Sequence, residues 1–156
     1  MSLLMKLGQR LGQQEWLASV GRKLVPLDLV VQRRTRGRVS LLGLVGIPPV
    51  VLTTTGRRSG KPREVPLLPV KFRNGYLVTG SNWGQAHHPA WSENLLAHPD
   101  AEILLRGRRI PVRGRLLEGA ERAEAWAAIT KVWPGYDTYD ERSGDRQIRV
   151  FLLEPR

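Results

Sequence analysis

The residues best suited to chemistry lie in one segment, Thr53–Arg63, whose sequence is TTTGRRSGKPR. Its glycines would let backbone N–H groups approach an anion, and its basic side chains would neutralise the charge. The polar side chains concerned are Arg57, Arg58, Ser59, Lys61 and Arg63. The segment is no P-loop, because three residues separate the glycines where that motif has four, and Pro62 follows the lysine where it has Ser or Thr. We therefore expect an anion site, with a basic hairpin loop that only faces water as the alternative.

Two further segments combine aromatic and polar side chains. Ser81–Gly84 would form a small polar turn before a helix that begins near Trp91. A helix N-terminus favours negative charge, and an aromatic ring beside it could stack on a planar ligand, although tryptophans more often belong to the core. In Trp133–Tyr139, two tyrosines, Tyr136 and Tyr139, follow a predicted helix on an irregular turn. Their hydroxyls could donate a hydrogen bond or a proton to a substrate, or their rings could hold the turn on the domain.

The sequence does not indicate a metal site, a reactive cysteine or the nucleophile of a serine hydrolase. The chain contains no cysteine, which excludes thiolate metal sites, disulfides and cysteine nucleophiles. The three histidines, His87, His88 and His98, lack a spacing that would converge on one metal ion. Ser59 lies outside a Gly-x-Ser-x-Gly sequence, so it is not expected to be a hydrolase nucleophile. We predict no metal site.

Short β-branched runs and intervening helices must position these segments. Strands are predicted at residues 50–55, 65–72, 76–79, 102–105, 108–117 and 147–153, with an Asn74-Gly75 turn closing one hairpin. Helices are predicted over 3–20, 89–97 and 119–132, the last with an inner face of Ala123, Trp126, Ala127 and Ile129. Pro26 is expected to interrupt the N-terminal helical region. About six strands joined by short turns predict a mainly β fold, an antiparallel barrel with flanking helices.

The excess positive charge is confined to the N-terminal half. The net charge is +11, and residues 1–73 carry 14 basic and three acidic residues. Residues 1–49 are predicted to form a basic helical segment and residues 50–156 the barrel domain. Residues 1–38 could pack on the barrel with solvated arginines or contact an anionic lipid surface. No apolar run approaches the roughly 20 residues of a membrane-spanning helix, and no secretory signal is recognised.

Taken in order, these segments resemble the deazaflavin-dependent nitroreductase family, the coenzyme F420-binding proteins of actinobacteria with a split β-barrel fold. The match begins with LTTTGRRSGKPR at residues 52–63 and Pro66-Leu67, and continues with Ser81-Asn82 and the pattern Pro89-x-Trp91-x-x-Asn94-Leu95. It ends with Pro134-x-Tyr136-x-x-Tyr139, Asp145-Arg146-x-Ile148 and Leu153-Glu154-Pro155. Each motif is modest alone, but the ordered set, from about residue 50 to the end, is specific.

The resemblance implies an oxidoreductase in which reduced deazaflavin delivers a hydride to a small organic acceptor such as a quinone, an enone or a nitro compound. The cofactor's phosphodiester and polyglutamate tail are anionic, which fits the basic loop. By the family's pattern, the phosphate and tail are held by Arg57, Arg58, Ser59, Lys61, Arg63, Pro66, Leu67 and Leu68. The ring is lined by Thr79, Ser81, Asn82, Ala90, Trp91 and Asn94. The family places tyrosines over the acceptor pocket, and Tyr136 and Tyr139 match two of them; we expect Tyr136 and Ser81 to donate hydrogen bonds to the acceptor.

Alternative functions remain open from the sequence. A split barrel could instead bind flavin mononucleotide (FMN) or haem, although no histidine or cysteine is well placed as an axial haem ligand. Arginines and five tryptophans also suit a single-strand nucleic-acid binder. No nucleic acid is expected, however, because the aromatics lie near loops and helix starts rather than on strands. We expect a cytoplasmic monomer or homodimer, and binding of its basic segment to the inner face of the plasma membrane is the open alternative.

Overall fold

The computed structural model describes residues 15–41, 49–81, 87–137 and 147–156 of the chain. The predicted helix over residues 3–20 lies mainly outside these ranges. Helix α2 (Glu15–Thr35) is a single helix that contains Pro26, so the expected interruption at this proline is wrong. A proline inside a helix removes its own N–H from the helix ladder, and its ring crowds the carbonyl four residues earlier, but the turns that follow Pro26 bury Asp28 and Gln32. The burial of these side chains keeps α2 helical beyond the proline.

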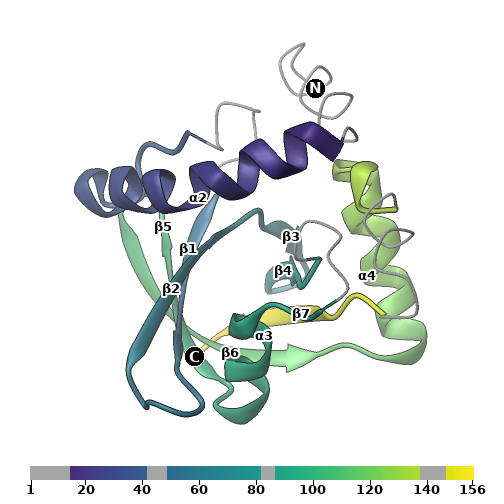
Figure 1. The fold of residues 1–156 in the computed structure, drawn as a ribbon. Helices are drawn as coiled ribbons and strands as arrows, with labels where there is room; N and C mark the ends of the chain where they lie inside the picture. The colour runs from purple at the N-terminus through teal and green to yellow at the C-terminus, as the bar shows by residue number, and fades with distance from the viewer. Residues whose placement is uncertain (1–14, 42–48, 82–86, 138–146) are drawn as a thin grey trace.

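Among the described residues, seven antiparallel strands form one sheet in the order β2-β1-β5-β6-β7-β4-β3. The strands are β1 (Val50–Thr55), β2 (Pro62–Leu67), β3 (Val70–Phe72), β4 (Gly75–Thr79), β5 (Asp100–Leu105), β6 (Arg108–Leu116) and β7 (Val150–Pro155). The edge strands β2 and β3 are separated in sequence by only Leu68 and Pro69. The sheet must therefore curl until its two edges approach each other (Figure 1), which confirms the predicted split-barrel class.

The break between β2 and β3 corrects the single strand predicted over residues 65–72. Pro69 has no N–H to donate to a strand ladder. Leu67 packs on one hydrophobic cluster and Leu68 on the other, so the chain passes here from one edge of the sheet to the opposite edge. Local apolar patterning cannot show such a crossing, because the residues on both sides of it are suited to strands.

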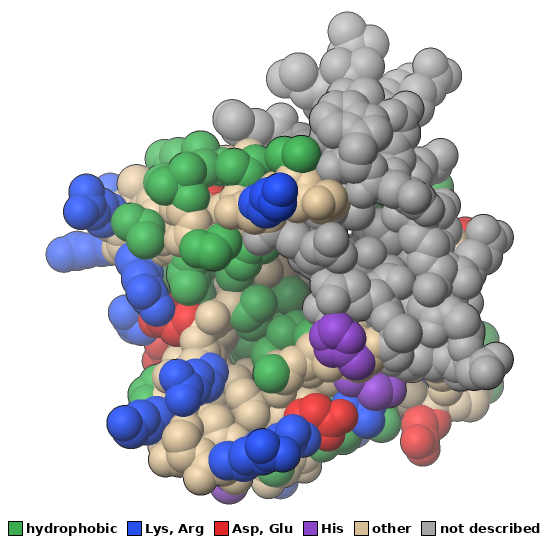
Figure 2. Space-filling model, in the orientation of Figure 1, with side chains coloured by type: hydrophobic (Ala, Val, Ile, Leu, Met, Phe, Trp, Pro, Cys, Tyr) green, Lys and Arg blue, Asp and Glu red, His purple; other side chains and the backbone are tan. Residues whose placement is uncertain are grey.

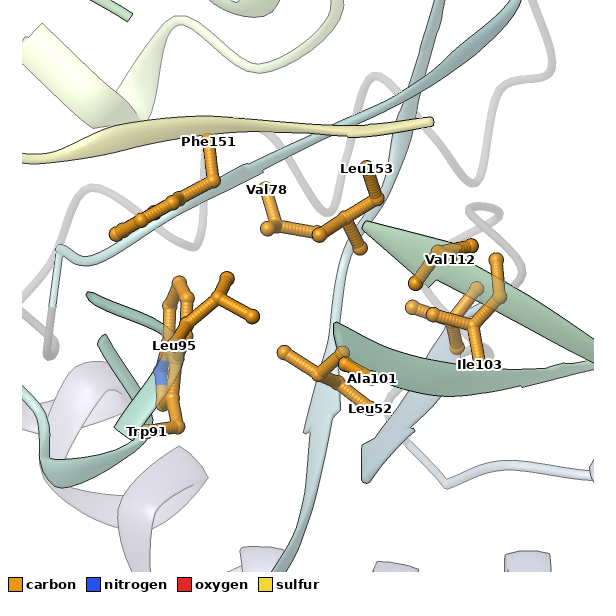
Figure 3. Packing of buried hydrophobic residues seen from close by; sticks show 10 residues of the cluster. Leu52, Val78, Trp91, Leu95, Ala101, Ile103, Val112, Phe151 and Leu153 are labelled. Atoms are coloured by element: carbon orange, nitrogen blue, oxygen red, sulfur yellow. The ribbon is translucent and has the colours of Figure 1, made fainter. Parts of the chain in front are cut away.

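Two hydrophobic clusters share the sheet. The barrel cluster consists of Val50, Leu52, Val78, Trp91, Leu95, Ala101, Ile103, Val112, Phe151 and Leu153 (Figure 3). The second cluster lies against α4 (Gly119–Val132) and consists of Leu77, Leu117, Ala125, Ile129, Trp133, Tyr136, Ile148, Val150 and Leu152. Strand β7 contributes to both, because Phe151 and Leu153 alternate with Val150 and Leu152 along the pleat. The strand is therefore buried on both faces.

Helix α4 meets the sheet through a different face from the one predicted. Ala125 and Ile129 are buried and Trp126 is half-buried, whereas Ala123 and Ala127 are exposed. The prediction is right for Ile129 and Trp126 and wrong for the two alanines. An alanine methyl buries too little apolar surface to orient a helix, so the larger side chains decide.

Two glycines permit close approaches that fix the elements around the site. The predicted Asn74-Gly75 hairpin exists, but Gly75 pairs with Phe72 as part of β4, and a Cβ on it would lie 2.2 Å from the Leu153 carbonyl oxygen. A Cβ on Gly114 of β6 would lie 2.6 Å from the Leu95 side chain. Helix α3 (Ala90–Ala97) is thus seated on β6 through Leu95.

Candidate functional site

The loop between β1 and β2 is folded on itself and presents its basic side chains to solvent. The Gly56 N–H donates to the Lys61 carbonyl and the Gly60 N–H to the Gly56 carbonyl, both at 2.8 Å. The Ser59 hydroxyl oxygen accepts from the Lys61 N–H at 3.2 Å and from Arg63 Nη2 at 3.5 Å. The exposed basic residues are Arg57, Arg58, Lys61 and Arg63. The structure therefore gathers the predicted cations at the end of one hairpin.

The side chain of Asn94 ties this loop to helix α3. It is buried, its Oδ1 accepts from the Arg57 N–H at 3.1 Å, and its Nδ2 donates to Thr54 Oγ1 at 3.2 Å. Because Thr54 lies on β1, one amide joins the strand, the loop and the helix. Arg57 and Asn94, two predicted site residues that are 37 positions apart in the sequence, are neighbours in the structure.

A carboxylate between two arginines lies beside this tie. Glu93 Oε2 is 3.2 Å from Arg57 Nη1, and Glu93 Oε1 is 2.6 Å from Arg149 Nη1. The hydrogen bond from Arg149 is the main cause that lowers the pKa of the Glu93 carboxyl; partial burial opposes it, and the charges of Arg149, Arg57 and His88 reinforce it. Sequence reasoning did not assign Glu93 or Arg149 to the site. They are 56 positions apart, and the only signal in the sequence is a cation directly before an apolar strand.

Trp91 lies in the barrel interior. It is 7% exposed, and its ring centroid lies 5.7 Å from that of Phe151 at an interplanar angle of 58°. Ala90, the residue before it, is exposed at the start of α3. Trp91 thus has the position of a core residue, which was the alternative that the sequence left open. Ala90, in contrast, is accessible to solvent.

Tyr136 is buried in the cluster against α4, where its ring centroid lies 6.4 Å from that of Trp126. Burial raises the pKa of the Tyr136 hydroxyl, and its interaction with the Thr79 hydroxyl opposes the rise. Thr79 Oγ1 is itself buried and has no hydrogen bond of good geometry to any group in the described ranges. Ser81, two residues beyond Thr79, is half-buried. The structure therefore brings Tyr136 close to the end of β4.

The remaining predicted positions lie at the sheet edge or outside the described residues. Pro66 is buried on β2, and Leu67 and Leu68 pack on the two different hydrophobic clusters. Asn82 and Tyr139 lie outside the described residues. Within the described ranges, no group of three His, Asp or Glu side chains could hold a metal ion, and no helix is long and apolar enough to cross a membrane.

A cavity of about 340 Å³ beneath the C-terminal end of α2 was not predicted. It is lined by Arg33, Arg36, Val51, Thr53, Glu64, Leu104, Gly107 and Arg109. Arg33 pairs with Glu64, and Arg109 pairs with Glu102 at 2.7 Å. Figure 2 shows basic side chains gathered at this end of α2 and again over the β1–β2 hairpin. The cavity could not be predicted from the sequence, because the turn between β5 and β6 lies next to α2 only in the folded chain.

The β1–β2 loop and the start of α3 are compatible with a phosphorylated cofactor. Arginine and lysine side chains on a hydrogen-bonded loop suit phosphate and carboxylate groups. At the end of β4, the buried Thr79 hydroxyl lies near that of Tyr136, and its Oγ1 has no hydrogen bond of good geometry within the described ranges. The donor set therefore fits an anionic group at the loop and a polar group near β4.

Comparison with known families identifies the group to which this architecture belongs. The family model described as F420H(2)-dependent quinone reductase matches residues 27–155. The chain belongs to this family. The F420H(2)-dependent quinone reductase Rv1261c of Mycobacterium tuberculosis is 31% identical over 146 residues, which cover 90% of this chain and 97% of that protein.

Solved structures agree with this membership of the F420H(2)-dependent quinone reductases. An F420-H2 dependent reductase, FDR-A, has a TM-score of 0.63 and 37% identity, with 69% of this chain and 94% of that chain covered. A structure described as a domain-swapped dimer has a TM-score of 0.65 and 34% identity, with 83% of this chain and 99% of that chain covered. The family confirms the resemblance, the enzyme class and coenzyme F420 rather than FMN as cofactor. The division of the chain at residue 49 and the roles of single residues stay predictions.

Proposed function

We propose that this chain reduces a quinone with a hydride from reduced coenzyme F420, and that the β1–β2 loop and α3 hold the anionic part of the cofactor. The observation that carries the proposal is the Asn94 amide, which fixes the Arg57 backbone to α3 at 3.1 Å. A loop tied to a helix presents its cations in a fixed geometry, so less conformational entropy is lost on binding. Family membership supplies the cofactor and the reaction class.

The cations of the loop supply most of the binding energy for the anionic part. Arg57, Arg58, Lys61 and Arg63 neutralise the phosphodiester and the glutamate carboxylates, and arginines can do so with two parallel hydrogen bonds. Ser59 holds the loop closed through its contacts with Lys61 and Arg63. Leu67 and Leu68, both half-buried, offer apolar surface next along the chain, and the buried Pro66 precedes them.

The ring and the acceptor are assigned to the end of β4 and the turn after α4. When bound, the reduced deazaflavin supplies the hydride. Thr79, Ser81, Asn82 and Ala90 line its ring, with Trp91 supporting α3 from the core. The hydrogen-bond donors to the charge that develops on the quinone oxygen are Tyr136, Tyr139 and Ser81. The Tyr136 hydroxyl is protonated at neutral pH already at its ordinary pKa of 10, and burial raises the pKa further, so the group can act as a donor.

The test is a titration of the full chain with coenzyme F420, followed by tryptophan fluorescence, with FMN and NADPH in parallel. We expect micromolar or tighter binding of F420 alone, and oxidation of reduced F420 by menadione only when the protein is present. The double variant R58Q/K61Q should bind F420 about tenfold more weakly or worse, while R73Q, a charge change on the β3–β4 turn, should not. Saturation by FMN without binding of F420 would contradict the cofactor, and binding without turnover of any quinone would contradict the acceptor.

We further propose that α2 docks the enzyme on an anionic lipid surface at the inner face of the plasma membrane. Val20, Leu24, Leu27 and Val30 recur at helical spacing and are 42%, 37%, 54% and 43% exposed. By the same helical spacing, Lys23 and Arg34 fall on this outer face. An apolar stripe with interspersed cations is suited to the boundary between headgroups and acyl chains.

Vesicle sedimentation tests this docking. The chain should sediment with phosphatidylcholine vesicles that contain phosphatidylglycerol and not with phosphatidylcholine alone. L27E/V30E should abolish sedimentation, whereas L96E, at a leucine on α3 that is about as exposed as Val30, should not. If a second copy of the chain covers the stripe instead, L27E/V30E will turn a dimer into a monomer in size-exclusion chromatography and leave vesicle binding absent in every variant.

A further inference from the structure

Glu93 joins two arginines that have different surroundings. Its Oε1 is 2.6 Å from Arg149 Nη1, and its Oε2 is 3.2 Å from Arg57 Nη1. The Arg149 side chain is 22% exposed and the Arg57 side chain 40%. Each arginine uses a separate carboxylate oxygen, so one contact can break while the other persists.

Arg149 is the fixed partner of Glu93. Its Nη1 also donates to Ser92 Oγ at 3.2 Å, and its carbonyl accepts from the Gly80 N–H at 2.8 Å. The Ser92 hydroxyl in turn donates to the Pro89 carbonyl at 2.9 Å, at the start of α3. The guanidinium is thus held against the first turn of α3, and the Arg149 backbone is held at the end of β4.

Arg57 is the partner that can redirect its charge. Its backbone is fixed by Asn94, but its side chain has the longer contact with Glu93 and the greater exposure. The other cations of the loop, Arg58, Lys61 and Arg63, have no carboxylate partner within the described ranges. In the free protein, Glu93 therefore neutralises one cation of a loop whose other cations are available to an anion.

We propose that Glu93 occupies the Arg57 guanidinium until an anion takes its place, and that Arg149 is the positioning residue that keeps Glu93 neutralised after the exchange. The proposal rests on the proposed function only in taking that anion to be the phosphate of the cofactor. Without Arg149, the exchange would leave the Glu93 carboxylate without its main hydrogen-bond donor beside the incoming anion, and like charges at short range repel each other. With Arg149 present, the exchange breaks one partly exposed ion pair, which contributes little. Arg149 thus raises the affinity for the anion without touching it.

Three variants separate this exchange from a merely structural role. In R149M, Arg57 is the one arginine left beside Glu93, and His88 adds only the smallest of the charge effects, so the affinity for F420 should fall about tenfold. In E93Q the competitor is gone, so the affinity should rise about threefold. In E93Q/R149M no carboxylate needs a partner, and the affinity should return to at least the wild-type value. The controls are R73M on the β3–β4 turn, which changes the net charge as R149M does, and E121Q on α4, which changes it as E93Q does. Both should stay within about twofold of wild-type affinity.

The measurement is a fluorescence titration of each variant of the full chain with coenzyme F420, with thermal unfolding as the check on folding. The second readout needs no F420: the Arg57 Nε–Hε NMR signal is followed during titration with inorganic phosphate. It should shift at lower phosphate concentration in E93Q than in wild type, and at higher concentration in R149M. If wild type does not bind F420, the proposed function fails, and the phosphate titration still decides the exchange.

Two results would overturn the proposal. If E93Q/R149M binds as weakly as R149M, Arg149 contacts the anion itself or acts through the fold. If E93Q binds F420 and phosphate more weakly than wild type, Glu93 orients Arg57 for the anion instead of competing with it.

Discussion

The Arg57 backbone N–H donates to the Asn94 side-chain Oδ1 at 3.1 Å. The β1–β2 loop therefore takes its position from α3, although β2, β3 and β4 lie between them in the sequence. The contact fixes the backbone of Arg57 and leaves its guanidinium to pair with Glu93 or with a ligand. The other end of the same amide donates to Thr54 Oγ1. Helix α3 is therefore the element against which both β1 and the basic loop are placed.

Replacing Asn94 by alanine should weaken the site more than the fold. Two hydrogen bonds of a buried amide are lost, which should cost about 1–3 kcal/mol of unfolding free energy. The affinity for F420 should fall about tenfold, because the loop loses its fixed geometry. Urea denaturation and F420 titration measure the two effects, and N74A, in the exposed β3–β4 turn, should change neither. Wild-type affinity in N94A would show that the tie has no part in binding.

Helix α3 in turn depends on Gly114. A Cβ at this position would lie 2.6 Å from Leu95 Cδ2, so G114A should displace α3 and cost about 1–3 kcal/mol of unfolding free energy. In an L95A background the added methyl has room, and the same change should cost far less. Denaturation of the four proteins of this cycle measures the coupling. If G114A costs the same unfolding free energy in both backgrounds, the added methyl group does not clash with Leu95.

The strands were predictable from the sequence because their physics is local. Val50–Thr55 is a β-branched run that ends at a glycine, and the observed β1 has the predicted bounds. The crossing at Leu68-Pro69 and the continuation of α2 through Pro26 were not predictable. Each depends on what the segment packs against, which becomes defined only when the sheet curls.

The candidate site divides in the same way. The cations of the β1–β2 loop are contiguous in sequence, so their common position follows from one hairpin. Glu93 and Arg149 belong to a helix and to the approach to the last strand, and no local pattern relates them. For Trp91 the sequence admits both a stacking platform and the more frequent core position, and its contact with Phe151 places it in the barrel.

The stability of the chain should depend on the ionisation of Glu93 at acid pH. Its pKa is lower in the folded chain than the ordinary 4.5, mainly through the hydrogen bond from Arg149. A lowered carboxyl pKa stabilises the folded state fully above the unfolded pKa, and this contribution is lost as pH falls through the folded value. The difference in unfolding free energy between wild type and E93Q should therefore be constant from neutral pH to about pH 5 and shrink below about pH 4.5.

Urea denaturation at a series of pH values measures this difference. The same comparison in an R149M background is the control, because removal of Arg149 removes the main cause of the shift. The pH dependence should be smaller there. Parallel profiles for wild type and E93Q down to pH 3 would show that the Glu93 carboxyl is no more stable as an anion in the folded chain than in the unfolded one.

Removal of the Tyr136 hydroxyl should separate acceptor chemistry from cofactor binding. Y136F keeps the ring that packs against Trp126 but removes the interaction with the buried Thr79 hydroxyl, so the unfolding free energy should fall by about 1–3 kcal/mol. If the hydroxyl donates to the developing charge on the quinone, kcat/KM should fall about tenfold to a hundredfold, while the Kd for F420 stays unchanged. Because burial raises the pKa of Tyr136, wild type should show no loss of rate from deprotonation of this group up to about pH 10, its ordinary pKa.

Y76F, at a half-buried tyrosine of β4 that faces Lys71, is the matched control and should keep full activity. Wild-type kcat/KM in Y136F would assign Tyr136 to packing alone and leave hydrogen-bond donation to Ser81 and Tyr139.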